Sequence, residues 1–136
     1  MNGRMLILIA GLLGATGVVM GAFAAHSMKP WLKSQSLSDE EVQKRLEYVE
    51  IGSRYHMYHA VAVLALAALA SANNPINVTV PAWMFLLGTA IFSGCLYAMA
   101  ITGIRQLGAV VPIGGTLFII GWLWLVGKGL GPGTNP

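Results

Sequence analysis

The stretch RYHMYHAVAVLALAALA, residues 54–70, joins a polar, ring-rich cluster directly to a run of pure hydrocarbon. Its first six positions hold two histidines, two tyrosines, an arginine and a methionine, and the eleven that follow hold only alanine, valine and leucine. Tyrosine favours the level at which a membrane meets water, because it is an apolar ring with a polar tip. The stretch therefore indicates a membrane-spanning helix with a polar and aromatic collar at one end.

The composition of the whole chain supports a membrane environment. Of its 136 residues, 56% are hydrophobic and 10% are charged, and the net charge is +3. An average soluble domain carries roughly 25% charged residues, so this chain has too few to cover a surface that faces water. Its basic residues are scattered, which argues against nucleic-acid binding. The length suits a single domain over residues 1–136.

Four segments of the chain lack Asp, Glu, Lys and Arg and have the length of a membrane span. Each has 18 to 21 residues, which suits a hydrocarbon core of about 30 Å. Backbone groups in lipid must bond within their own segment, so the segments are expected to be helices. The first exceeds the about 7–15 apolar residues of a secretion signal, and we expect it to be retained. We predict an all-α membrane protein, a bundle of four transmembrane helices over about 5–25, 55–72, 82–102 and 107–127.

The basic residues divide unevenly between the two sides of such a membrane. Four spans put both termini and the loop at 73–81 on one side, and the long loop 27–54 on the other. Basic residues are more frequent on the cytoplasmic side, which predicts a cytoplasmic long loop. The loop side holds Lys29, Lys33, Lys44, Arg45, Arg54 and Arg105, and the other side holds Arg4 and Lys128.

The long first loop contains a helix signal of its own. Ser38 and Glu41 have the spacing of a capping box, in which the hydroxyl and the carboxylate satisfy backbone donors at a helix start. We expect an amphipathic helix over about 39–53, which lies at the interface or runs straight into the second span, with a bend at Gly52. Acid-first pairs four residues apart support it: Glu40 with Lys44, Glu41 with Arg45, and Glu50 with Arg54.

Small residues and one proline mark the predicted contacts between spans. Small side chains let membrane helices approach closely, and a proline inside a helix removes a backbone bond and kinks it. We expect Pro112 to kink the fourth span, and the lone Cys95 to act as a small apolar residue. The predicted packing and kink residues are Gly14, Gly17, Gly21, Gly94, Pro112, Gly114 and Gly115.

Three histidines, His26, His56 and His59, fall at the predicted ends of the first two spans. Antiparallel spans would bring them to one level, and three imidazoles with an open position suit zinc, while histidine also ligates haem. One hypothesis is therefore a metal or haem site. The alternative is that His26 and His59 hydrogen-bond across the helix pair while His56 faces the lipid headgroups. Under this alternative, replacing His59 by alanine lowers stability and replacing His56 barely changes it.

Two further function classes remain at this stage. Transport or proton relay would require ionisable groups deep in the membrane, and the deepest polar groups here are Ser93, Cys95 and Tyr97. The chain shows no Ser/His/Asp or Cys/His arrangement for nucleophilic work, so we expect it not to be an enzyme. The remaining class is a binding or structural subunit. The expected structural polar cluster is His26, Arg54, Tyr55, Tyr58, His59, Ser93 and Tyr97.

Five short motifs in order resemble a known family. They are GAFAAH (21–26), YHMYH (55–59), FSGCLY (92–97), PIGG (112–115) and GW (121–122). The chain resembles, over nearly its whole length, the domain-of-unknown-function 423 family of small bacterial inner-membrane proteins, which is similar to the mitochondrial transmembrane protein 256. The resemblance implies four transmembrane helices in the plasma membrane and no known activity.

The resemblance also bears on individual residues. It implies glycine at Ala24, glutamine at His56 and serine at Cys95. A metal role shared by the family therefore cannot depend on His56, which favours a hydrogen-bonded pair of His26 and His59. The remaining positions that it singles out are Tyr55, Ser93, Gly94, Tyr97, Pro112, Gly114 and Gly115.

From these observations we predict a small multi-pass membrane protein that is an accessory or interaction subunit of a larger membrane complex. Its expected partners are the lipid bilayer and either a larger complex or further copies of itself. No cofactor is expected. Metal or haem binding through His26 and His59, and a small oligomeric transporter or channel, are the alternatives.

Overall fold

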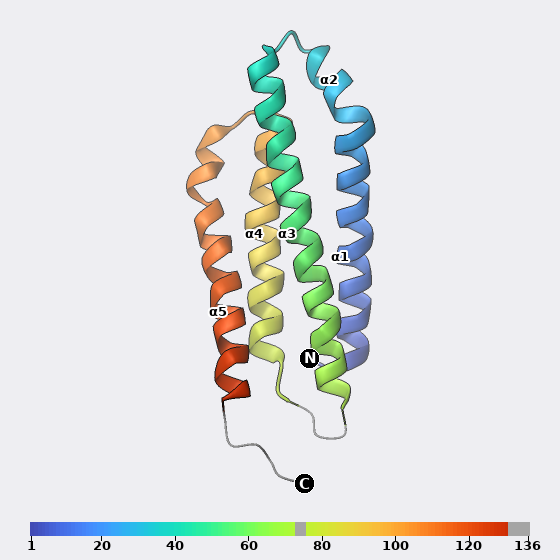
Figure 1. The fold of residues 1–136 in the computed structure, drawn as a ribbon, viewed down its shortest axis with the longest axis vertical. Helices are drawn as coiled ribbons and strands as arrows, with labels where there is room; N and C mark the ends of the chain where they lie inside the picture. The colour runs from blue at the N-terminus through green and yellow to red at the C-terminus, as the bar shows by residue number, and fades with distance from the viewer. Residues whose placement is uncertain (73–75, 131–136) are drawn as a thin grey trace.

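A computed structural model describes residues 1–72 and 76–130 and is helical nearly throughout. Residues 73–75 of the predicted second loop lie outside the described residues. The elements are α1 (Gly3–Phe23), the π-helical turn η1 (Ala24–Met28), α2 (Lys29–Lys33), α3 (Asp39–Ser71), α4 (Thr79–Thr102), the 3₁₀ helix η2 (Arg105–Ala109) and α5 (Val111–Gly129). Consecutive long helices run antiparallel (Figure 1).

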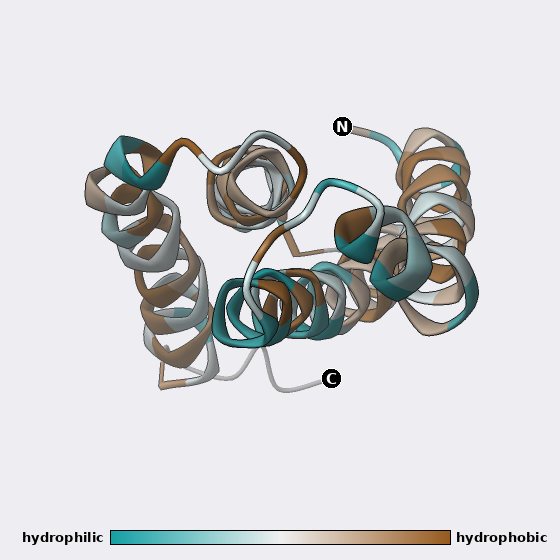
Figure 2. Ribbon diagram, turned by 90° about the horizontal axis from the view of Figure 1, so that it is seen from above, coloured by the Kyte–Doolittle hydropathy of each residue, from teal (hydrophilic) through white to brown (hydrophobic). Residues whose placement is uncertain are grey.

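The four long helices form an open row. The principal contacts join α1 to α3, α3 to α4 and α4 to α5. Seen end-on in Figure 2, the helices make a bent row with α1 and α5 at its two ends. The four predicted helices are therefore present, and among the described residues they form an open row in which each outer helix has one long neighbour.

The first helical region is longer than the predicted span 5–25. Asn2 caps it, since its side-chain oxygen accepts a hydrogen bond from Met5 N at 2.9 Å. The helix then continues through η1 and α2 as far as Lys33. Pro30 does not stop it. It lies just after the π-helical turn η1, where the backbone hydrogen bonds already depart from the α-helical pattern. The predicted loop 27–54 is consequently reduced to the short connection before Asp39.

α3 is a single helix of 33 residues. Ser38 caps it as predicted, with its hydroxyl accepting from Glu41 N at 3.2 Å. The predicted amphipathic helix 39–53 runs straight into the predicted span, which was one of the two expected arrangements (Figure 1). The helix is not interrupted at Gly52. Gly52 instead gives room to α4, because a Cβ there would lie 2.9 Å from the ring of Tyr97.

Pro112 begins a helix instead of kinking one. The predicted span 107–127 is divided between η2 and α5, and Pro112 lies in the first turn of α5. Proline is tolerated there because the first backbone N–H groups of a helix have no partner within it. The kink expected at Pro112 is therefore a wrong prediction.

The close backbone contact of the fold lies between α4 and α5. A Cβ on Gly114 would lie 2.5 Å from the backbone N of Phe92, and one on Gly88 would lie 3.1 Å from the carbonyl oxygen of Gly114. A Cβ on Gly121 would similarly lie 2.5 Å from the ring of Phe85. Glycine is needed wherever two helices approach this closely. Gly114 thus serves packing as predicted.

The small-residue stripes make a smaller contribution than expected. Cβ atoms on Gly14, Gly21 and Gly94 would meet no described atom within 4 Å, and one on Gly17 would make ordinary contacts with His56 and Met57. The buried residues of α1 are Gly3, Leu6, Ala10 and Gly17. α1 therefore packs on α3 through these residues. Gly14 borders a groove shared with Met57 and Ala60 of α3 and makes no close contact there.

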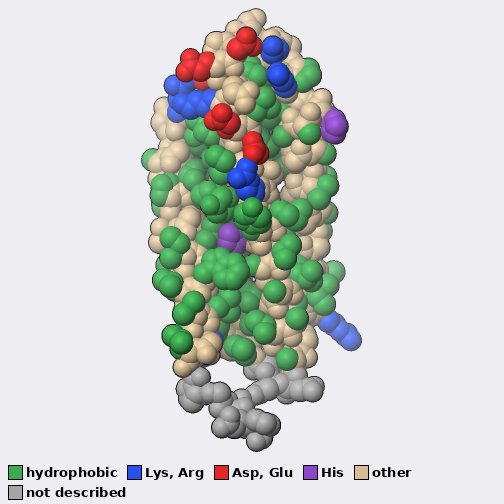
Figure 3. All heavy atoms as spheres, in the orientation of Figure 1, with side chains coloured by type: hydrophobic (Ala, Val, Ile, Leu, Met, Phe, Trp, Pro, Cys, Tyr) green, Lys and Arg blue, Asp and Glu red, His purple; other side chains and the backbone are tan. Residues whose placement is uncertain are grey.

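Three of the described helical regions are long and apolar enough to cross a membrane: Gly3–Lys33, Thr79–Thr102 and Arg105–Gly129. α3 differs from them because its first half is rich in charged and polar residues. Charged side chains gather at the end of the molecule formed by α2 and the start of α3, above a mainly hydrophobic surface (Figure 3).

Candidate functional site

Two buried histidines on α3 lie in different helix interfaces. His56 and His59 have relative exposures of 7% and 4%. His56 contacts α1 and α4, whereas His59 contacts α4 and α5. His56 was expected at the headgroups, and this prediction is wrong, because it faces the inside of the row.

His56 is hydrogen-bonded to two other helices. Its Nε2 lies 3.5 Å from the hydroxyl of Thr16, and its Nδ1 lies 3.2 Å from the hydroxyl of Tyr97. The Thr16 hydroxyl donates its only proton to the carbonyl of Leu12 at 2.8 Å. It can therefore only accept from His56, so the proton of His56 is on Nε2 and Tyr97 donates to Nδ1. One imidazole thus links α1, α3 and α4.

His59 has the opposite proton placement. Its Nδ1 lies 2.8 Å from the carbonyl oxygen of Tyr55, which can only accept, so the proton is on Nδ1. Its Nε2 accepts a hydrogen bond from the indole N–H of Trp122 at 3.4 Å. The imidazole stacks on Phe118 with ring centroids 3.5 Å apart and planes 6° from parallel. His59 is held mainly by rings and by its own helix.

Each histidine borders a groove on the surface of the row. The groove beside His56 has a volume of about 210 Å³ and lies between α1 and α4. The groove beside His59, which we call the aromatic groove, has a volume of about 410 Å³ and lies between α3 and α5. The aromatic groove is lined by Tyr55, His59, Phe92, Pro112, Gly115, Thr116, Phe118, Ile119 and Trp122.

His26 takes no part in either arrangement. It is exposed, and it lies in η1. Gly17 faces Met57 across the α1–α3 interface, so His26, nine residues further on, comes level with Tyr48. That is eleven residues from His59, or about 16 Å along the helix axis. The predicted His26–His59 pair is therefore absent among the described residues, because both helices extend past the expected span ends.

The same register excludes the three-histidine metal site. Across residues 1–72 and 76–130, no three His, Cys, Asp or Glu side chains are placed to hold one metal ion. The arrangement of His26, His56 and His59 does not suit a shared metal, and both ring nitrogens of His56 and of His59 already have protein partners.

The rest of the predicted polar cluster is split among separate contacts. Ser93 donates to the carbonyl of Gly52 at 2.8 Å, which ties α4 to α3. Arg54 pairs with Glu50 on the same helix. Tyr58 is exposed. The cluster is thus not one site, although Tyr55 and His59 do share the aromatic groove.

Sequence reasoning missed the partners of both histidines. Thr16 and Tyr97 are 40 and 41 residues from His56, and Trp122 is 63 residues from His59. Phe118 carried no signal beyond being apolar. The available hints were the FSGCLY motif, which includes Tyr97, and the GW motif, which includes Trp122, but neither showed which histidine its residue meets.

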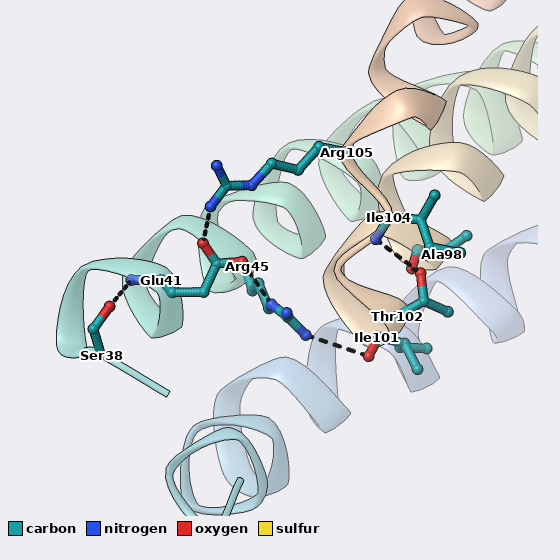
Figure 4. A network of polar contacts seen from close by, with 8 residues as sticks. All are labelled: Ser38, Glu41, Arg45, Ala98, Ile101, Thr102, Ile104 and Arg105. Atoms are coloured by element: carbon teal, nitrogen blue, oxygen red, sulfur yellow. Dashed lines mark hydrogen bonds and ion pairs between the residues drawn. The ribbon is translucent and has the colours of Figure 1, made fainter. Parts of the chain in front are cut away.

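A third polar site lies at the charged end of the molecule (Figure 4). Glu41 accepts from Arg45 at 3.0 Å and from Arg105 at 2.6 Å. Arg45 also reaches the carbonyl of Ile101 at 3.5 Å, near the end of α4. Gly103 has φ 77°, and a Cβ there would lie 2.2 Å from the Arg45 guanidinium. The site joins the start of α3 to the α4–α5 connection.

The hydrogen bonds from the two arginines lower the pKa of Glu41 below its ordinary value. The bond from Arg45 is the largest cause and the bond from Arg105 is the second, while partial burial opposes them. The carboxylate is thus held in its charged form. Arg45 is buried, with a relative exposure of 9%. Its burial is tolerated because its charge is paired with Glu41 and hydrogen-bonded.

Comparison with known proteins places the chain among small bacterial membrane proteins. The model of a family described as "Protein of unknown function (DUF423)" matches residues 20–115. A UPF0382 membrane protein of Staphylococcus epidermidis is 40% identical over 90% of this chain and 93% of its own. The UPF0382 membrane protein YwdK of Bacillus subtilis is 34% identical over 90% and 94%. One of Haemophilus influenzae is 38% identical over 92% of each chain. No solved structure matches the chain.

Proposed function

This chain belongs to the DUF423 family of membrane proteins of unknown function, and from that premise we propose that it is a non-catalytic accessory subunit of a larger membrane complex. It crosses the bacterial inner membrane four times, with the short loop between α2 and α3 in the cytoplasm. Three helical regions with the length and composition of a span support this topology directly. The place of α3 in the row supports the fourth crossing.

α3 can cross a membrane despite its polar residues because of its central place. It packs on α1 along one side and on α4 along another. The buried imidazoles of His56 and His59 are hydrogen-bonded inside the protein. Polar groups in a bilayer are tolerated when they face protein and are paired. The last third of α3 holds only alanine, valine and leucine over residues 60–70.

The open row is the observation that carries the accessory role. In the most apolar windows of the three candidate spans, 39% of residues are buried for α4, but only 17% for each of the other two. Gly14 and Gly21 on α1 and Gly94 on α4 also face open space. Membrane helices associate through close packing at small residues. These surfaces have the shape and composition to accept the helices of another membrane protein.

Native mass spectrometry after gentle extraction from the host membrane tests the proposal. We expect one foreign subunit in stoichiometric amount. The sharper comparison uses Gly94→Ile and Gly127→Ile, because both glycines have no described neighbour within 4 Å. Gly94→Ile should remove the partner and Gly127→Ile should keep it. A monomer contradicts the accessory role. A partner that remains bound in both variants contradicts the placement of the contact surface at Gly94.

The same measurement separates the alternatives. A channel or transporter would appear as an oligomer of this chain alone and would pass ions in reconstituted vesicles. Metal or haem binding through His26 and His59 has lost its support, because the two residues lie at different levels.

A further inference from the structure

The aromatic groove is a cavity that neither the packing of the row nor the accessory role explains. α3 and α5 both pack on α4 and not principally on each other, and the space between them has a volume of about 410 Å³. Phe92 and Phe118 lie in it side by side, with ring centroids 5.7 Å apart. Because α5 is a candidate membrane span, the groove faces the bilayer sideways.

The walls of the groove are flat rings. Tyr55 packs on Phe92 at a centroid distance of 4.9 Å, and His59 stacks on Phe118. Tyr55 and Trp122 have relative exposures of 40% and 48%, so both rings present a free face to whatever enters. Aromatic rings favour offset or edge contacts with another ring. The shape therefore suits a planar ring better than a lipid acyl chain.

The hydrogen bond between Trp122 and His59 is the polar contact in the groove that a bound hydroxyl can replace. Trp122 N–H and His59 Nε2 are 3.4 Å apart, longer than the usual N–H···acceptor distance of about 2.9–3.0 Å. The indole can only donate. The proton of His59 is on Nδ1, bonded to Tyr55 O, so its Nε2 can only accept. A bound hydroxyl can replace this long bond once the half-exposed Trp122 ring moves outward, and it then accepts from the indole and donates to the imidazole.

A second polar group lies further along α5. Thr116 lines the groove six residues before Trp122, which is about 9 Å along a helix. Its hydroxyl donates to Pro112 O at 2.9 Å, so its oxygen remains able to accept. No lysine, arginine, aspartate or glutamate is among the residues that line the groove. A phosphate headgroup would therefore find no counter-charge, whereas a neutral ring with hydroxyls at opposite ends finds a partner at each end.

We propose that the aromatic groove binds the head group of a lipid-soluble quinol. One hydroxyl lies between Trp122 and His59, the ring packs against Tyr55 and Phe92, and the second hydroxyl donates to Thr116. The apolar tail leaves past Ile119, which is exposed on the outer side of α5. Binding alone is inferred, with no change in the oxidation state of the ligand. Quinol binding does not require a protein partner. The accessory role can therefore hold without quinol binding, and quinol binding can hold without the accessory role.

The test uses the purified chain in lipid nanodiscs with a decyl-substituted benzoquinol, kept reduced, and its dimethyl ether as probes. Empty nanodiscs correct for partition into lipid. Quenching of tryptophan fluorescence and the unfolding midpoint report binding. We expect saturable binding of the quinol about tenfold tighter than that of the ether, since the ether has no hydroxyl to donate to His59.

Four variants make the test specific. Trp122→Phe and His59→Phe should each remove the preference for the quinol while keeping a ring in place. Gly115→Val should block both probes, because its side chain enters the groove beside Phe92. Trp83→Phe is the matched control, since Trp83 is 50% exposed and lies outside the groove.

Three outcomes overturn the proposal. They are equal binding of quinol and ether, unchanged binding in Trp122→Phe and Gly115→Val, and a retained phospholipid that the quinol does not displace. Trp122 is half-exposed, so Trp122→Phe decides the matter even where His59→Phe fails to fold.

Discussion

His56 and His59 are three residues apart on one helix and both are buried, but their ring nitrogens have different kinds of hydrogen-bond partner. His56 carries its proton on Nε2 and bonds to side chains of two other helices, whereas His59 carries its proton on Nδ1 and bonds to its own helix. His56 lies between helices that it ties together. His59 lies against rings, with its second nitrogen toward a groove. Both imidazoles are buried to a similar degree, so their different roles follow from their hydrogen-bond partners. An imidazole bonded to side chains of other helices holds those helices together, and one with a nitrogen facing a groove can line a ligand site.

The difference has a geometric origin. Two residues three apart on a helix point about 60° away from each other. That angle is enough, in a row of helices, to send one side chain into the α1–α4 side and the other into the α4–α5 side. Four substitutions test this difference between the two histidines.

Gly114→Val should have the largest effect, because it moves the helix that carries the rings around His59. A Cβ there would lie 2.5 Å from Phe92 N and 2.9 Å from Gly88 O, so α5 must shift away from α4. We expect a loss of about 2–3 kcal/mol in the free energy of unfolding in mixed micelles. Gly115→Ala is the control, since its Cβ would make ordinary contacts at 3.9 Å with the Phe92 ring. Equal losses would show that α4 and α5 do not approach as described.

His56→Leu should have the next largest effect, because it removes a link between three helices. We expect a loss of about 1–2 kcal/mol, since Tyr97 loses its buried acceptor. His56→Gln should lose less, because an amide can still donate to Thr16 and accept from Tyr97. In a double-mutant cycle with Tyr97→Phe, the coupling should be about 0.6–1.7 kcal/mol. Strictly additive losses would show that His56 and Tyr97 do not interact.

Glu41→Gln should have a smaller effect that depends on pH, which separates charge from burial. The folded-state pKa of Glu41 is lowered, first by Arg45 and then by Arg105. The carboxylate therefore contributes stability that is present above its unfolded pKa and is lost as the pH falls through the lowered folded pKa. The variant should be less stable than the parent at neutral pH and equal to it in acid. Salt should reduce the difference. Glu40→Gln should show a smaller difference, because Glu40 interacts with the helix N-terminus but has no arginine bonded to it among the described contacts. A difference that persists in acid would rule out charge as its cause.

Trp122→Phe should have the smallest effect on stability. The bond to His59 is long and Trp122 is 48% exposed, so we expect a loss of no more than about 0.5 kcal/mol. The unfolding midpoint in the same micelles measures it. A loss as large as that of His56→Leu would show that the Trp122–His59 bond stabilises the helix packing as strongly as the bonds of His56 do. The two histidines would then not differ in this respect.

The helices were predictable to different degrees for physical reasons. The predicted segment 82–102 falls within α4, which begins at Thr79 and ends at Thr102. An uncharged apolar run of this length, with polar residues at both ends, is typical of a single helix. The span at 5–25 was too short, because His26 and Ser27 are polar but do not end a helix. Pro112 was taken for a kink, since sequence does not show whether a proline lies in a helix interior or in its first turn.

The candidate site was only half predictable. Tyr55 and His59 were singled out because they are polar rings beside a hydrocarbon run. Their partners Phe92, Phe118 and Trp122 come from two other helices. Phe92 and Trp122 stood in the quoted motifs FSGCLY and GW, but nothing local showed that these rings and Phe118 face His59 rather than lipid.

The sequence by itself determined that this chain is helical, that it belongs in a membrane and that Ser38 starts a helix, because composition, charge-free length and a capping hydroxyl are local properties. Only the tertiary structure decided that the helices form an open row, that His26 is about 16 Å from the level of His59, and that two neighbouring histidines have opposite proton placements. Lipid-facing and protein-facing sides of a span are equally apolar, so residue type does not reveal which side packs. Helix register depends on where backbones can approach, as at Gly88 and Gly114.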